Sequence, residues 1–99
     1  MMIDVMKEDN TCVLHPQGWI DSANSAELEG AVMSNAAECE KIILDLADVD
    51  YISSAGLRVI VAAHREMEKK QGLIIRNMKG SVHDIISLTG FDKKLNIEK

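Results

Sequence analysis

Two adjacent serines, Ser53 and Ser54, stand before an apolar stretch of helical spacing, and Gly56 follows closely. The first backbone N–H groups of a helix have no partners within it, so a serine here can accept a hydrogen bond as an N-cap. The same helix end also tolerates negative charge. A phosphate on Ser54 would therefore alter the surface and leave the fold intact. Residue propensity does not decide which serine is the cap.

Serine chemistry of another kind, nucleophilic hydrolysis, needs a base and an oxyanion hole. The residues around Ser54 depart from the Gly-x-Ser-x-Gly elbow, and neither His15 in a strand nor His83 at a helix start is placed to act as the base. His64 falls on an apolar stripe, which indicates a histidine at the edge of the core. No phosphate-binding glycine motif occurs. We therefore expect a non-enzymatic protein without a cofactor.

Strand-like and helix-like segments alternate along the chain. Strands are predicted at residues 2–6, 11–15, 41–46 and 73–77, with 94–97 as a short last strand or a frayed tail. Helices are predicted at residues 24–36, 54–71 and 81–89, with Asn24–Glu27 as a capping box and Ser81 as a cap. The short turn at residues 8–10 predicts an antiparallel first pair, and Pro16 ends its second strand or marks a bulge.

This order predicts an α/β fold in one domain over residues 1–99. Strand-helix-strand units require right-handed parallel crossovers, so the sheet should be mixed, with four to five strands and three or more helices packed against it. Sites in such sheets form where strands end. Loops 18–22 and 48–57 should therefore be neighbours, with Asp21 near Ser54. Trp19, in the first loop, either covers the end of the sheet or anchors a partner.

Composition and charge exclude several classes of partner. The net charge is −5 and no basic stripe occurs, which argues against nucleic acid and against direct binding to an anionic membrane. Residues 1–8 carry acidic side chains, unlike a signal peptide, so we expect a cytoplasmic protein. Cys12 and Cys39 lie far apart and outside any Cys-x-x-Cys pair, so we expect two reduced thiols and no metal site.

Three segments carry a resemblance to a known family. Residues 45–57, Asp-Leu-Ala-Asp-Val-Asp-Tyr-Ile-Ser-Ser-Ala-Gly-Leu, resemble the signature of the STAS domain, the sulphate-transporter and anti-sigma-factor-antagonist family. Residues 18–21, Gly-Trp-Ile-Asp, resemble its Gly-x-Leu/Ile-Asp motif, and residues 88–91, Leu-Thr-Gly-Phe, resemble its Leu-x-Gly-hydrophobic ending. The matches span nearly the whole chain at compatible spacing.

The resemblance implies an anti-sigma-factor antagonist of a bacterial partner-switching pathway, which regulates transcription in stress or sporulation signalling. The unphosphorylated antagonist binds an anti-sigma factor that is also a serine kinase, phosphorylation separates the two, and a serine phosphatase restores the serine. The phosphoacceptor aligns with Ser54, with Ser53 as second choice. The implied partner-binding residues are Trp19, Asp21, Ser22, Tyr51, Ser53, Ser54, Ala55, Gly56 and Arg58. The alternative is an unphosphorylated scaffold or accessory subunit of a signalling assembly or membrane transporter.

Overall fold

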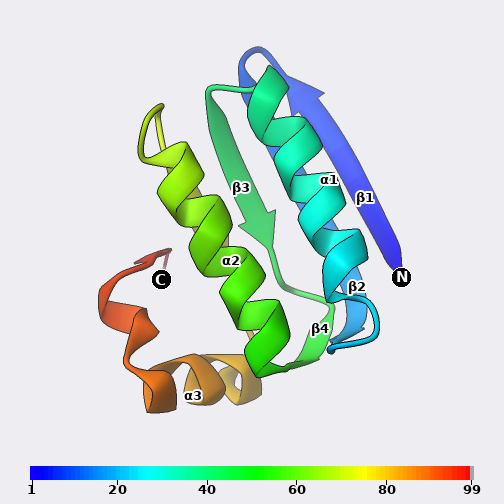
Figure 1. Cartoon of the computed structure of the whole chain (residues 1–99), viewed down its shortest axis with the longest axis vertical. Coiled ribbons are helices and arrows are strands. Elements are labelled where there is room, and N and C mark those ends of the chain that lie inside the picture. The colour runs from blue at the N-terminus through cyan, green and yellow to red at the C-terminus, as the bar shows by residue number, and fades with distance from the viewer. Residues whose placement is uncertain (99) are drawn as a thin grey trace.

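A mixed β-sheet carries the helices α1 and α2 side by side on one of its faces, and α3 lies across one end (Figure 1). This computed structural model describes residues 1–98. Its elements are β1 (Met2–Glu8), β2 (Thr11–Ile20), α1 (Ser25–Glu38), β3 (Lys41–Asp45), β4 (Val49–Ile52), α2 (Ser54–Met67), β5 (Leu73–Arg76), α3 (Gly80–Thr89), the 3-10 helix η1 (Phe91–Lys93) and β6 (Asn96–Ile97).

The sheet has the predicted mixed topology. Its strand order is β1-β2-β3-β5-β6, with β1 antiparallel to β2 and the remaining pairs parallel. Residues 49–52, expected to be a loop, form the additional strand β4, which pairs with the end of β2. The described residues thus form six strands, and the tail contributes the last of them.

The second strand, β2, is longer than predicted and changes partner along its length. Its first half pairs with β3 up to Leu14, and its second half pairs with β4 from Gly18. Pro16 lies inside the strand, and the register shifts directly after Gly18, whose φ is +93°. Glycine adopts this left-handed backbone without a steric cost, so Gly18 allows the bulge at which β2 turns toward β4.

The core lies between the sheet and the two helices. The helices contribute buried apolar side chains at the predicted spacing, and alternate sheet residues such as Ile42 and Leu44 meet them. Each such side chain contributes about 1.5–3 kcal/mol relative to an exposed one. His64 is buried at the edge of this core, as predicted. Within residues 1–98, none of the helices combines the length and apolarity that crossing a bilayer requires.

The predicted capping box at the start of α1 is wrong. The Asn24 side chain makes no capping hydrogen bond, and its Oδ1 accepts instead from the backbone N–H of Asp21 at 2.9 Å. The Asp21 carboxylate in turn accepts from the N–H groups of Ala23 and Asn24, at 2.9 and 3.1 Å. The acidic residue of the preceding loop therefore organises this turn.

Two other helix boundaries also differ from the prediction. The third helix, α3, begins at Gly80 after Lys79, so Ser81 is already inside it and does not cap it. The Ser81 hydroxyl donates instead to the Asp50 carbonyl at 3.4 Å. The second helix, α2, ends at Met67, earlier than expected. Lys70 and Gly72 form a closing turn there by donating to the Met67 carbonyl.

The expectation of two reduced thiols is wrong, because Cys12 and Cys39 form a disulfide. Cys12 is buried near the start of β2, and Cys39 is buried at the C-terminal cap of α1. They are 27 positions apart in sequence, with Cα atoms 6.1 Å apart. The helix runs back along the sheet after β2, so its end returns to the level at which β2 begins (Figure 1).

Candidate partner-binding site

The two loops predicted to be neighbours do lie side by side. Trp19 pairs with Tyr51 and Ile20 with Ile52, because β2 and β4 run parallel. The backbone N–H of Ser53 donates to the Ile20 carbonyl at 2.8 Å, which ties the second loop to the end of β2. The strand ends therefore form one edge from which both α1 and α2 start.

The N-cap of α2 is Ser53. Its Oγ accepts from the backbone N–H of Gly56 at 3.1 Å, and its own backbone is extended. Ser54 is the first residue of the helix and is exposed. The fold therefore decides which serine is the cap. Ser53 caps the helix, and the hydroxyl of Ser54 is not the capping group.

The start of α2 sits directly on the sheet at Gly56. A Cβ atom there would lie 2.4 Å from Ile20 Cγ2 and 3.1 Å from Ile52 Cγ1, both in buried side chains. Real Cβ atoms do not approach branched side chains this closely, so only glycine allows the present seating of the helix. Gly56 is buried, and at this point of the fold it positions its neighbours at the start of the helix.

Replacing Gly56 with alanine is expected to destabilise the protein by about 1–3 kcal/mol, because the new methyl group overpacks against Ile20. The matched control is Gly30→Ala in α1, where a Cβ would meet nothing within 4 Å. That change should leave stability unchanged or raise it by up to about 1 kcal/mol. Urea unfolding of both variants measures the difference, and equal stability would contradict the close seating of α2.

Trp19 and Tyr51 form an exposed aromatic pair at this edge. Their ring centroids are 5.4 Å apart, and the side chains are 62% and 40% exposed. Successive strand residues point to opposite faces, and the adjoining Ile20 and Ile52 contact α2. The aromatic pair therefore points to the face of the sheet opposite α2. Such exposure favours a contact role for Trp19 over that of a buried cover, since Trp and Tyr are enriched among binding hot spots.

The other predicted residues lie around the same edge. Ser54 and Arg58 are both exposed and four residues apart on α2, so they share one side of the helix. Ser22 is exposed in the first loop, and Ala55 is half-buried. Asp21 is half-buried, and its carboxylate is directed into the turn before α1, where it accepts the backbone hydrogen bonds described above.

A third loop belongs to this edge and was missed in the sequence. Lys79, between β5 and α3, forms an ion pair with Asp50 of β4. The hydrogen bond to Asp50 raises the pKa of Lys79 above its usual value, and burial opposes this effect. The predicted topology could have located this loop. Because β5 is parallel to β3, the loop after β5 must emerge at the same edge of the sheet as the loop after β3.

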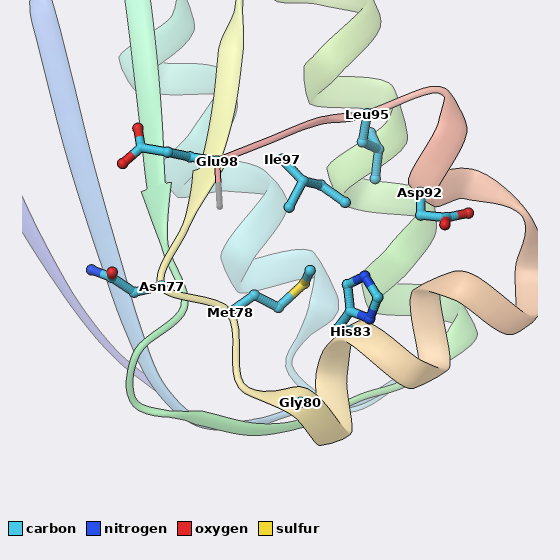
Figure 2. Close-up of a pocket in the computed structure, with 8 residues that line it drawn as sticks. All are labelled: Asn77, Met78, Gly80, His83, Asp92, Leu95, Ile97 and Glu98. Carbon is cyan, nitrogen blue, oxygen red and sulfur yellow. The ribbon is translucent and has the colours of Figure 1, made fainter.

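A pocket of about 700 Å³ opens beyond this edge, between the loop after β5, α3, η1 and β6 (Figure 2). Its lining includes His83 and Asp92, and Met78, Leu95 and Ile97 supply apolar walls. None of the residues predicted for partner binding lines it. The residues around Ser54 thus form an edge that is separate from the pocket.

Known proteins share the sequence pattern and the fold of this chain. Residues 2–99 match the family model described as the STAS domain. BtrV of Bordetella bronchiseptica, provisionally named an anti-sigma factor antagonist, is 33% identical over 93 residues, which cover 92% of this chain and 80% of BtrV. An anti-sigma factor antagonist from Mycobacterium paratuberculosis has a TM-score of 0.88 at 26% identity, covering 97% of this chain and 83% of the other.

A more distant structure shares the fold alone. The anti-sigma factor antagonist SpoIIAA of Bacillus, in its unphosphorylated form, has a TM-score of 0.82 at 16% identity. The match covers 99% of this chain and 89% of SpoIIAA. The family model spans nearly the whole sequence, and the Bordetella relative covers most of it. The chain therefore belongs to the STAS domain family.

Proposed function

We propose that this chain is an anti-sigma factor antagonist that binds an anti-sigma factor with serine kinase activity and is released when Ser54 is phosphorylated. The observation that carries the proposal is the division of roles between the two serines. Ser53 caps α2, and Ser54 presents an exposed hydroxyl on the first turn. The provisional name of the Bordetella relative supports the same role.

A phosphate on Ser54 would act on the partner and leave the fold in place. It adds about −1.5 to −2 charges at neutral pH. The start of a helix accommodates that charge, and the Arg58 guanidinium, one turn further on the same side, can pair with it. SpoIIAA, which shares this fold, is known in both an unphosphorylated and a phosphorylated form.

The docking surface in this proposal is the edge formed by the loops after β2 and β4. Trp19 and Tyr51 supply the apolar anchor on one side, and Ser54 and Arg58 lie on the helix side. A partner that spans the edge contacts both sides at once. Charge added at Ser54 would then be desolvated in the complex, where an unpaired charge is costly.

The test is phosphorylation by the cognate kinase with ATP, followed by mapping of the phosphate by mass spectrometry. We expect one phosphate, on Ser54, and its removal by a serine phosphatase. Ser54→Ala should abolish incorporation, and the matched variant Ser53→Ala should retain it, because that change removes the cap and keeps the acceptor. Phosphate on Ser53, or retained incorporation in Ser54→Ala, would overturn the assignment.

A further inference from the structure

A short loop joins the end of β2 to the start of α1 (Figure 1). Trp19 lies just before this loop, and its side chain is 62% exposed and packs against the ring of Tyr51. The core does not enclose a side chain in this position, so its direction depends on its own backbone. The contacts that hold the Trp19 main chain therefore also set the apolar anchor of the docking surface.

The Trp19 carbonyl lies along a part of β2 that β1 does not reach. The pairing of β1 with β2 ends at Gln17. On the other side of β2, the Ile20 carbonyl accepts from the backbone N–H of Ser53 at 2.8 Å, directly after β4. Successive carbonyls of a strand point to opposite sides, so the Trp19 carbonyl points away from β4. It therefore needs a partner from outside the sheet.

The Asn24 carboxamide supplies this partner. Its Nδ2 donates to the Trp19 carbonyl at 2.7 Å, and its Oδ1 accepts from the backbone N–H of Asp21 at 2.9 Å. A carbonyl at one end and an N–H at the other fix which atom of the amide is nitrogen and which is oxygen. One side chain therefore spans the main chain from residue 19 to residue 21.

Asp21 holds the same turn from the opposite direction. Its Oδ1 accepts from the backbone N–H groups of Ala23 and Asn24, and its carbonyl accepts from the N–H of Ser25 at 2.9 Å. Aspartate and asparagine favour such turns because their short side chains reach main-chain groups two or three residues away. Asp21 and Asn24 thus hold each other, since each side chain binds the main chain of the other.

We propose that Asp21 and Asn24 are positioning residues for partner binding, which hold the Trp19 main chain so that its side chain is ordered before the partner docks. The inference rests on the proposed function, because it concerns the same docking surface. It gives Asp21 a role other than direct contact with the partner. An anchor that is already ordered in the free protein loses less conformational entropy on binding, which strengthens the complex.

The test compares Asn24→Ala with Asn35→Ala. Asn35 is the matched control, because its Nδ2 also donates to a backbone carbonyl, that of Ala31, at 2.7 Å, but lies within α1. Far-ultraviolet circular dichroism verifies that both variants are folded. In titration calorimetry with the cognate anti-sigma partner, Asn24→Ala should bind about fivefold or more weakly than the wild type, and Asn35→Ala should bind equally well.

A spectroscopic measurement reports on Trp19 in the absence of any partner. The chain has one tryptophan and one tyrosine, Trp19 and Tyr51, so its near-ultraviolet circular dichroism depends on the geometry of this pair. Asn24→Ala should shift the spectrum toward that of Tyr51→Ala, in which the pair is absent. Asn35→Ala should keep the wild-type spectrum. The disulfide is kept intact in all samples, so that its own signal is constant.

Substitutions at Asp21 separate positioning from a direct charge contact. Asp21→Asn removes the charge and keeps an acceptor oxygen, so it should bind the partner within about threefold of the wild type. Asp21→Ala removes the acceptor and should resemble Asn24→Ala in both affinity and spectrum. If Asp21→Asn binds as weakly as Asp21→Ala, or if Asn24→Ala keeps the wild-type spectrum or affinity, the positioning role is overturned.

Trp19→Ala distinguishes a failure of this inference from a failure of the proposed function. It should weaken partner binding at least about 30-fold, as expected for a tryptophan anchor. Wild-type affinity in Trp19→Ala would contradict the docking surface itself, and the positioning role with it. Weakened binding in Trp19→Ala together with wild-type binding in Asn24→Ala would contradict the positioning role alone.

Discussion

Ser54→Asp is expected to weaken binding to the anti-sigma partner at least about 100-fold, which corresponds to about 2.7 kcal/mol. Ser54 is exposed on the first turn of α2, so a partner that docks on this edge must remove water from the side chain at this position. A carboxylate there loses its hydration when the partner docks, and the exposed Arg58 one turn away offsets only part of that cost. Fully phosphorylated protein should bind at least as weakly, since phosphate carries more charge. Isothermal titration calorimetry measures both affinities.

The matched variants separate charge from structure. Ser54→Ala should bind as the wild type does, because the Ser54 hydroxyl does not cap the helix. Ser53→Ala should lower the free energy of unfolding by about 1 kcal/mol through loss of the cap and should still bind. If Ser54→Asp binds with wild-type affinity, or if its melting temperature falls well below that of Ser54→Ala, charge at Ser54 is not the switch.

Reduction of the Cys12–Cys39 disulfide is expected to lower the free energy of unfolding by roughly 3.5 kcal/mol, from the loop that a separation of 27 residues closes. In a domain of this size, such a loss lowers the melting temperature by roughly 15 °C or more. The physical reason is that the cross-link restricts the unfolded chain. Calorimetry of the protein with and without a thiol reductant measures the shift.

The control is the double variant Cys12→Ala/Cys39→Ala, whose melting temperature should be low and insensitive to reductant. Both cysteines are buried, so loss of their packing adds to the effect in the variant and does not enter the comparison of the two redox states. Thiol titration establishes that reduction is complete. An unchanged melting temperature in the fully reduced wild type would contradict this stabilisation.

Local sequence patterns predicted much of this architecture. Apolar residues at helical spacing located α1 and α2, and the strand-helix order required a mixed sheet with neighbouring loops after two parallel strands. The residues around Ser54 and their resemblance to the STAS signature indicated the family. These predictions held because each depends on neighbours within a few residues, or on the fixed handedness of strand-helix-strand units.

Contacts between distant segments were decided only by the tertiary structure. β4 forms because residues 49–52 pair with the end of β2, at the bulge at Gly18. Ser53 caps α2 because its backbone hydrogen bond to Ile20 holds it in an extended conformation at the helix start. Residue propensity alone could not show which of the two serines would be the cap. The disulfide forms because α1 returns its end to the start of β2. The residue types restrict which contacts are possible, and the tertiary structure determines which segments come close enough to make them.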